Sequence, residues 1–345
     1  MKTELIITKP DDLHTHLRDD IYLKTTVPAT AAYCQRAIAM PNLKTPITTT
    51  ALALAYQKRI AEAIPTDNTF TPLMTLYFTD KLTPDEIFRA KQSGMIYAIK
   101  LYPAGATTNS AFGIKDIVSI YPQLEAMQQV DMPLLIHGEV VDENVDVFDR
   151  EKVFIEKYLS ILVRDFPKLR IVLEHITTAA AVEFIQQTRD NVAATITAHH
   201  LLYDRNALFK KGINPHYYCL PILKRHRDQV ALLEGIKSGN PRFFLGTDSA
   251  PHSQSNKECA HGCAGIYTAH AALGLYAEAF ELCDALDGLE NFASRFGAEF
   301  YHLPRNKEQI VLRRNAWQVP DFYTFGDEKV IPLRAGEMVN WGYSQ

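Results

Sequence analysis

The residues with the clearest capacity for chemistry lie in the segment Asp-Asp-Leu-His-Thr-His-Leu-Arg-Asp at 11–19. If this segment is a strand, His14 and His16 point the same way, and positions 13, 15 and 17 face the opposite way. Two imidazoles at this spacing are roughly 6–7 Å apart at the backbone and can converge on one metal ion. Arg18 follows on the same face, where its guanidinium can hold an anion. A surface strand can also carry His-x-His by chance, so the pair needs support from the rest of the chain.

Short apolar runs that alternate with helix-like segments dominate the first 250 residues. Strands are predicted at 13–17, 37–40, 73–77, 97–102, 134–137, 171–175, 193–198 and 243–247, and helices at 50–63, 84–93, 114–129, 153–165, 179–187 and 228–239. Such alternation predicts βαβ units and a parallel sheet. Eight units favour an α/β fold closed as a (β/α)8 TIM barrel over an open doubly wound sheet, and no GxGxxG motif follows the first strand.

Polar residues with metal-binding or proton-transfer chemistry stand at the carboxyl ends of six predicted strands. They are His14, His16, Arg18, Asn42, Lys100, His137, His175 and Asp248. Each one alone has an ordinary explanation, such as a hydrogen-bonded core histidine or an aspartate that caps the next helix. Barrel active sites are built at this face from several strand ends, so the combination predicts one metal-dependent site.

Lys100 is the most informative of these residues because it interrupts an apolar run. A buried lysine is costly while charged, so its pKa should fall and its amine should become neutral. A neutral amine can react with carbon dioxide to form a carbamate. The carboxylate end of a carbamate could bridge two metal ions roughly 3.5–4 Å apart that share a hydroxide.

These positions, with the runs AMPNL, KLYPAGATTNS, MPLLIHGEV, LEHITT and FLGTDSAPH, resemble the amidohydrolase superfamily. Within it, the chain is similar over nearly its whole length to the compact, homodimeric class (class II) of dihydroorotases. This resemblance implies reversible cyclisation of N-carbamoyl-L-aspartate to L-dihydroorotate with loss of water, the third step of de novo pyrimidine biosynthesis. It also implies two Zn²⁺ per subunit, a small-molecule substrate and a homodimer. Independently, an odd number of cysteines in a long chain without a signal peptide suggests a cytoplasmic enzyme.

The resemblance also implies a role for each matching residue. One zinc is bound by His14, His16 and Asp248, the other by His137 and His175, and Lys100, N6-carboxylated by CO2, bridges the two. Asp248 is the catalytic proton acceptor and donor. Substrate contacts fall to the side chains of Arg18, Asn42 and His252 and to the backbone at Leu220 and Ala264. Thr107 and Thr108 lie in a segment, 103–110, that either closes over the ligand or is an ordinary connection; the resemblance favours closure.

Length and composition bound the remaining possibilities. The 345 residues carry a net charge of −4, which gives no signal for nucleic acid or an anionic membrane. We see no apolar run long enough to span a membrane and no signal peptide, and five cysteines suggest reduced thiols. Two domains would fit this length, but we expect a single domain over 1–345. Its C-terminal extension from about 270 would hold helices near 269–280 and 289–296 and a short tail.

Several alternatives stay open at this point. Cys259 and Cys263 could form half of a zinc site, although no second close cysteine pair exists. His199 and His200 follow the seventh predicted strand and are expected to be structural. The chain could hydrolyse a different cyclic amide, but a neutral substrate would not need the cluster of Arg18 and its neighbours. It could also be a non-catalytic relative that lost its metals, but all six ligand positions are present.

Overall fold

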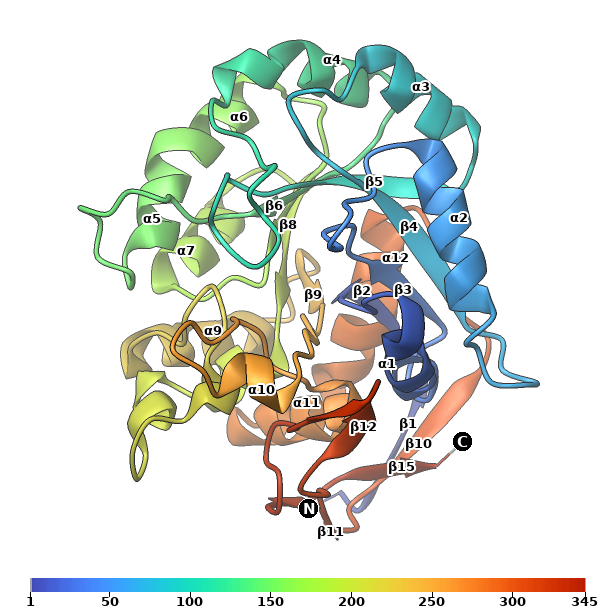
Figure 1. The fold of residues 1–345 in the computed structure, drawn as a ribbon. Coiled ribbons are helices and arrows are strands. Elements are labelled where there is room, and N and C mark those ends of the chain that lie inside the picture. The colour runs from blue at the N-terminus through green and yellow to red at the C-terminus, as the bar shows by residue number, and fades with distance from the viewer. Residues whose placement is uncertain (1, 345) are drawn as a thin grey trace.

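The computed structural model describes residues 2–344, and its centre is a ring of eight parallel strands surrounded by helices (Figure 1). Each strand pairs with the next one along the chain, in the order β2 to β9. The strands are β2 (Asp11–Thr15), β3 (Arg36–Ala39), β4 (Thr71–Tyr77), β5 (Ile96–Leu101), β6 (Leu134–His137), β7 (Ile171–Glu174), β8 (Val192–Ile196) and β9 (Phe243–Leu245).

The ring closes where the chain leaves β9 and meets β2. The Asp248 amide donates to the His14 carbonyl at 2.8 Å, and the His16 amide donates to the Ser249 carbonyl at 3.0 Å. The prediction of a closed barrel is therefore confirmed. The same seam places Asp248 directly beside the His-x-His segment.

The carboxyl ends of six strands were predicted one or two residues too long; β9, for example, ends at Leu245 and not at 247. Three residues just beyond these ends adopt left-handed backbone conformations, with φ of 60° at Arg18, 42° at His175 and 44° at Asp248. Non-glycine residues rarely adopt this conformation, and those that do cluster at functional sites. Here it turns polar side chains out of strand alternation and toward the barrel axis.

The barrel interior is apolar at one level and polar at the next. Ala98, Leu135, Val172 and Ala193 belong to a buried cluster inside the ring. Because alternate side chains share a face, the residues two positions further along these strands also point inward. They are Lys100, His137, Glu174 and Thr195, all at most 1% exposed.

Leu13 is an exception to the alternation of side chains along a strand. It packs in the interior cluster with Phe244, and yet the next residue, His14, also faces inward, toward the site. The β2–β3 register shifts between Asp12 and Thr15, which lets two consecutive residues face inward. Gly297 of α12 lies against Leu13, where a Cβ would overlap the leucine side chain. Helix α12 therefore covers the amino end of the barrel.

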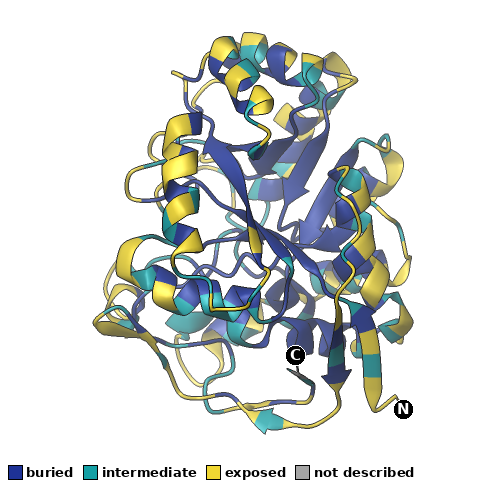
Figure 2. Ribbon diagram, turned by 90° about the vertical axis from the view of Figure 1, so that its right-hand side faces the viewer, coloured by how far each residue is buried: buried dark blue, intermediate teal, exposed yellow. Residues whose placement is uncertain are grey.

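The helices, apart from α12 at the amino end, lie around the outside of the ring, with buried faces toward the strands and exposed faces outward (Figure 2). They are α1 (Leu23–Ala31), α2 (Thr50–Ala61), α3 (Pro84–Gln92), α4 (Tyr121–Gln129), α5 (Arg150–Phe154), α6 (Ser160–Asp165), α7 (Ala179–Gln187), α8 (Ala198–Leu202), α9 (His226–Lys237), α10 (Gln254–Lys257), α11 (Ala272–Leu282) and α12 (Phe296–Phe300). Threonine hydroxyls at Thr49, Thr83, Thr178 and Thr197 accept an amide from the first turn of α2, α3, α7 and α8.

Two predicted helices differ from the structure. The helix expected over 114–129 begins as a 3₁₀ turn at Val118–Ile120 and becomes α-helical at Tyr121–Gln129. The preceding residues belong to a loop, in which Ile114 pairs with Pro103. The helix expected over 153–165 begins earlier, at Arg150, and contains a π-helical segment at Ile155–Leu159.

The expected short tail instead forms small antiparallel sheets. β1 (Glu4–Thr8) pairs with β10 (Gln309–Arg313), which pairs with β15 (Gly342–Ser344), near both chain ends in Figure 1. Two further pairs are β11 (Trp317–Gln318) with β14 (Met338–Val339) and β12 (Tyr323–Phe325) with β13 (Glu328–Val330). Trp341 is fully buried in the same apolar cluster as the strand–helix layer. Within residues 2–344, no helix is long and apolar enough to cross a membrane.

Candidate active site

The centre of the site is a contact of two histidines with one carboxylate. Asp248 Oδ1 lies 3.3 Å from His14 Nε2 and 3.0 Å from His16 Nε2. Burial alone would raise the pKa of Asp248, but the two neighbouring imidazoles hold that pKa well below its usual value. One ligand atom from each residue lies within 4.8 Å of the other two, as a shared cation requires.

The remaining predicted histidines continue this cluster across the barrel mouth. The ring centroid of His175 lies 5.0 Å from that of His14 and 4.9 Å from that of His137. His14, His137 and His175 are at most 2% exposed. Three different strands therefore deliver their imidazoles to one small volume.

Lys100 lies at the floor of this volume and is fully buried. Burial lowers the pKa of its amine to about 8, although Glu174 and Asp248 are close enough to oppose the shift. Its Nζ makes no hydrogen bond and lies 5.0 Å from the Tyr102 ring centroid. The amine is thus isolated from protein acceptors and faces the other polar side chains.

Two glutamates that carried no predicted role hold the histidines in place. Glu174 Oε2 bonds His14 Nδ1 at 2.8 Å and accepts from Thr195 Oγ1 at 2.6 Å. Glu139 Oε2 bonds His137 Nε2 at 2.8 Å. A carboxylate on one ring nitrogen fixes the imidazole and directs its other nitrogen toward a metal. Strand alternation identifies Glu174 as inward-facing, so its sequence signal was available.

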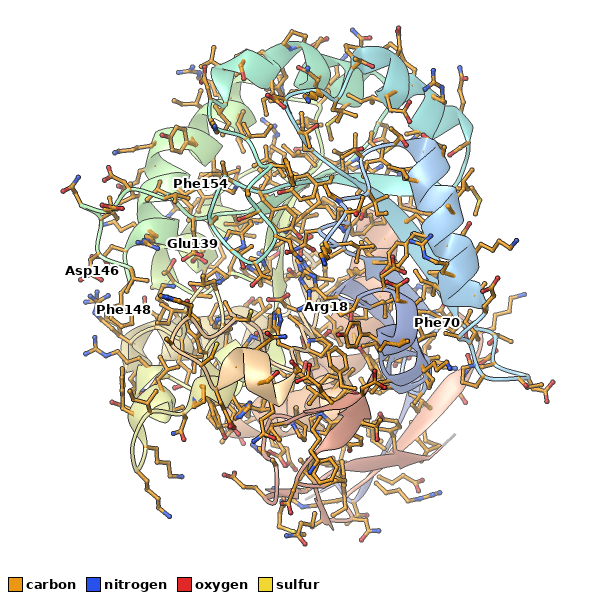
Figure 3. The ribbon with its side chains drawn as sticks, in the orientation of Figure 1. Arg18, Phe70, Glu139, Asp146, Phe148 and Phe154 are labelled. Atoms are coloured by element: carbon orange, nitrogen blue, oxygen red, sulfur yellow. The ribbon has the colours of Figure 1, made fainter. Side chains whose placement is uncertain are left out.

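The predicted substrate-binding residues form a second layer at the mouth, where Arg18 lies near the middle of the ring (Figure 3). Arg18 donates through Nε to the Pro251 carbonyl at 2.9 Å and contacts His252 Nε2 through Nη2, also at 2.9 Å. The same His252 nitrogen lies 3.0 Å from the Ala264 carbonyl. Since one ring nitrogen cannot both accept from Arg18 and donate to that carbonyl, only one of these bonds exists at a time.

The loop after β5 lies over this layer. Thr108 Oγ1 donates to the Ala264 carbonyl at 3.3 Å, and Asn42 Nδ2 donates to the Thr108 carbonyl at 3.1 Å. Thr107 and Leu220 line the same cavity, together with the histidines, Arg18 and Asp248. All predicted site residues except His252 and Lys100 line this cavity directly; His252 contacts it through Arg18, and Lys100 lies beneath it.

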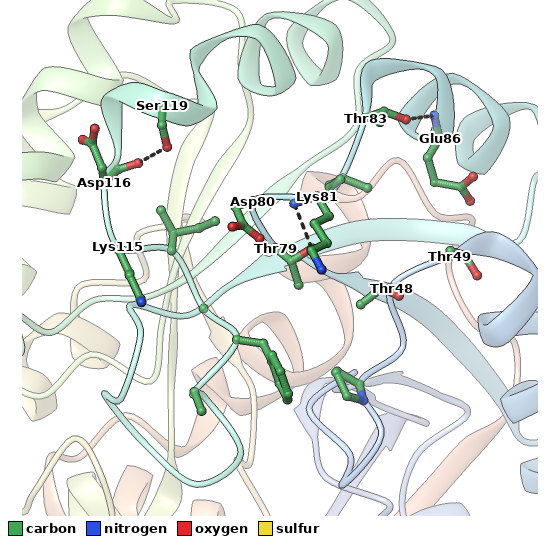
Figure 4. Close-up of a pocket in the computed structure, with 16 residues that line it drawn as sticks. Thr48, Thr49, Thr79, Asp80, Lys81, Thr83, Glu86, Lys115, Asp116 and Ser119 are labelled. Carbon is green, nitrogen blue, oxygen red and sulfur yellow. Dashed lines mark hydrogen bonds between the residues drawn. The ribbon is translucent and has the colours of Figure 1, made fainter.

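The cavity itself has a volume of about 20 Å³, which is room for about one water. A larger cavity of about 670 Å³ lies elsewhere, beside Thr48, Lys81 and Lys115 (Figure 4). That larger space contains none of the predicted site residues. Thr107 and Thr108 contribute to the wall of this small cavity, and a ligand larger than a water molecule does not fit the volume as it stands.

The unsatisfied polar atoms around the cavity fit a pair of metal ions. His175 Nδ1 and Lys100 Nζ are buried and have no hydrogen-bond partner, and the approach of His14 Nε2 to Asp248 is long, at 3.3 Å. Buried polar groups are normally paired, so these atoms indicate a partner that protein atoms do not supply. Imidazole and carboxylate donors are a set that zinc prefers.

The other candidate metal ligands of the sequence lie outside this cavity. Cys259 and Cys263 lie in an exposed loop, and within residues 2–344 they belong to no cluster of three metal-binding side chains. His199 and His200 instead gather with Cys219 in a buried group outside the cavity.

Comparison with known proteins decides the family. The amidohydrolase family model matches residues 6–321. The chain belongs to the amidohydrolase family. A curated dihydroorotase from Shewanella denitrificans is 60% identical over 337 residues, which cover 98% of each chain. This chain is therefore a member of the dihydroorotases, as the sequence motifs predicted.

Two solved dihydroorotases share the fold of this amidohydrolase over its whole length. The enzyme from Campylobacter jejuni superposes with a TM-score of 0.91 at 37% identity and covers 100% of this chain and 99% of its own. The Saccharomyces cerevisiae enzyme, solved in complex with 5-fluoroorotic acid, has a TM-score of 0.91 at 34% identity and covers 99% of both chains.

Proposed function

We propose that the chain interconverts N-carbamoyl-L-aspartate and L-dihydroorotate at the carboxyl end of its barrel. The observation that carries this proposal is the convergence of six ionisable side chains from five strands, two of which, His175 and Lys100, have buried, unpaired nitrogens. The yeast relative binds 5-fluoroorotic acid, a pyrimidine carboxylate. A ligand of this class matches the arginine-bearing layer above the histidines.

Two zinc ions are the cofactor that this donor set fits. His14, His16 and Asp248 would hold one ion, and His137 and His175 the other. Lys100 would bridge them after its neutral nitrogen bonds carbon dioxide and loses one proton. When bound, the metals polarise the amide carbonyl and acidify a water.

Asp248 has the position and charge to move the proton. Its pKa is held well below the usual value, so it is a carboxylate at neutral pH and can accept a proton. In ring opening, Asp248 takes a proton from the attacking water and gives it to the leaving ring nitrogen; in ring closure, it removes a proton from the ureido nitrogen.

Arg18, Asn42 and His252 recognise the substrate carboxylate. A carboxylate between Arg18 and His252 would accept from both residues, which removes the competition for His252 Nε2. The backbone at Leu220 and Ala264 would meet the ring edge. The Thr107–Thr108 loop then closes and excludes water.

The direct test is the ultraviolet absorbance of dihydroorotate after mixing with purified, zinc-loaded protein. We expect rapid loss of absorbance that a chelator abolishes and added zinc restores. Faster hydrolysis of a neutral hydantoin than of dihydroorotate would reject this substrate.

Elemental analysis should find two zinc ions per subunit. The homodimer and the cytoplasmic location stay predictions, and sedimentation equilibrium would test the former.

A further inference from the structure

A second buried group of metal-binding side chains lies outside the cavity described above. His199 and His200 belong to α8, and Cys219 stands directly before Leu220. Their exposed fractions are 0%, 2% and 1%. One ligand atom from each lies within 4.8 Å of the other two. Within residues 2–344, only one other trio, His14 with His16 and Asp248, meets this condition.

His199 is the member that most needs a partner. Both of its ring nitrogens are buried and have no hydrogen bond. A buried imidazole that makes neither of its hydrogen bonds destabilises the fold. Native proteins rarely leave such a group without a partner, so an additional ligand is indicated.

His200 is oriented toward the same point. Its Nδ1 lies 2.7 Å from Thr197 Oγ1, and its Nε2 lies 3.8 Å from Cys219 Sγ and 2.9 Å from the Pro221 carbonyl. The threonine hydroxyl can accept as well as donate, so the imidazole can carry its proton on Nδ1. The Pro221 carbonyl only accepts, so Nε2 donates to it at 2.9 Å; a bound cation would replace this hydrogen bond, with the proton on Nδ1 held by Thr197 Oγ1 and the Nε2 lone pair directed at the cation.

We propose that His199, His200 and Cys219 bind a divalent cation of the zinc class at a site separate from the histidine–lysine–aspartate centre. With bonds of about 2.0–2.1 Å to nitrogen and 2.3 Å to sulfur, tetrahedral ligands lie roughly 3.3–3.6 Å apart. The 3.8 Å between Sγ and His200 Nε2 is close to that spacing. The thiol gives up its proton to water when the metal–sulfur bond forms. The Pro221 carbonyl or a water completes the coordination.

Occupancy of this site acts on the substrate cavity through the backbone. Cys219 is covalently joined to Leu220, and Leu220 lines the cavity. A cation that fixes Cys219 therefore fixes one wall of the cavity. We expect occupancy to change KM for dihydroorotate more than kcat.

The sulfur ligand makes the site visible independently of the proposed reaction. Full-length protein is freed of metal by dialysis against chelator, checked for retained fold by circular dichroism, and titrated with Co²⁺ alone. We expect a thiolate-to-cobalt charge-transfer band in the near ultraviolet, because the other centre has only nitrogen and oxygen donors. Cys219→Ser should abolish this band. Cys283→Ser is the matched control, since Cys283 is another buried thiol and bonds only helix carbonyls.

Two outcomes would overturn the proposal. The first is a wild-type protein without the band at saturating Co²⁺. The second is a band that survives in Cys219→Ser and is lost in Cys259→Ser or Cys263→Ser, because the exposed loop would then supply the sulfur. If Cys219→Ser does not fold, His199→Gln serves instead: we expect at least tenfold weaker cobalt binding, and unchanged binding rejects the site.

Discussion

At the amino ends of the barrel strands, Arg36 donates to both carboxylate oxygens of Asp11 at 2.8 and 2.6 Å, and Asn306 adds a bond of 2.9 Å. At the carboxyl ends, the amine of Lys100 and Nδ1 of His175 are buried without a partner. The polar groups of Asp11 and its partners at the amino end of the barrel are thus hydrogen-bonded, whereas some of those at the carboxyl end are not. Saturated groups stabilise the fold, whereas unsaturated groups are available to a ligand.

A second pair at the amino end follows the same rule. Arg170 bonds both carboxylate oxygens of Asp131 and donates to the Phe300 carbonyl at 2.6 Å. This ties the segments before β6 and β7 to α12. Substitutions at the amino end should therefore change the free energy of unfolding, and substitutions at the carboxyl end should change metal content and turnover.

Lys100→Ala is the substitution with the largest expected effect on that contrast. It removes the only lysine at the floor of the site, so we expect loss of the bridged metal pair and of nearly all turnover. Elemental analysis and dihydroorotate turnover are the measurements. Lys9→Ala is the matched control, since Lys9 is also buried but lies at the amino end. Two tightly bound zinc ions in Lys100→Ala would exclude a bridging role.

Asp248→Asn should have the second-largest effect. An amide cannot take up the proton, so kcat should fall by about 10²–10⁴ while dihydroorotate still binds. Binding is measured by calorimetry and kcat by absorbance. Turnover within a few fold of wild type would mean that another group moves the proton.

Glu174→Gln tests whether the outer carboxylate matters. The amide cannot orient His14 as a charged acceptor does, so zinc affinity or turnover should fall by about 10–100-fold. Glu278→Gln is the control, because Glu278 is also a buried carboxylate but bonds Arg334 far from the metals. If Glu174→Gln and Glu278→Gln lost the same amount of zinc, the loss would reflect lower stability of the protein and not the contact between Glu174 and His14.

Thr108→Ala should have a smaller effect. It removes one neutral hydrogen bond of the closed loop, so turnover should fall by up to about tenfold with zinc content unchanged. Stopped-flow turnover and elemental analysis on one preparation give both values. Parallel loss of zinc and turnover would assign the loop to the metal centre itself.

Arg36→Met should leave turnover per folded molecule unchanged. It strands the buried Asp11 carboxylate, so the free energy of unfolding should fall by about 3–5 kcal/mol. Urea unfolding measures the stability, and kcat is normalised to the folded fraction. A lower kcat in fully folded Arg36→Met would show that the amino end of the barrel also affects turnover. The proposed separation of stability from activity between the two ends would then be wrong.

Local patterns were sufficient to predict the barrel and the strand-end residues that meet at its mouth, whereas Leu220, His252 and Ala264 were expected only from the family resemblance. Period-2 and period-3.6 runs located all eight strands, and the parallel order then fixed which ends converge. Glu174 was accessible by the same reasoning, because it lies two residues after the inward-facing Val172. Its neighbour His175 reaches the site only because its left-handed backbone breaks the alternation, and no pattern of residue types predicts that.

The features that sequence reasoning missed depend on partners far away in the chain. β1 has no strand signal of its own beyond a short apolar run, and its pairing with β10 is not local. Helix α1 contains Pro28 and several β-branched residues, which disfavour a helix, yet burial of Leu23, Val27 and Ala31 stabilises it. Tertiary packing therefore determines both the pairing of β1 and the formation of helix α1.

The pairing of β1 with β10 has a consequence for how the chain is made. β1 leaves the ribosome before any barrel strand, but β10 begins only at Gln309, 301 positions after its ladder partner Thr8. Until β10 is made, β1 is an unpaired edge strand and Ile7, which is 1% exposed in the folded protein, faces water; such an edge can pair with another nascent chain. Folding is therefore complete only when β1, which is synthesised first, pairs with β10, which is synthesised near the end. A chaperone that covers the edge of β1 until then would raise the yield of folded protein.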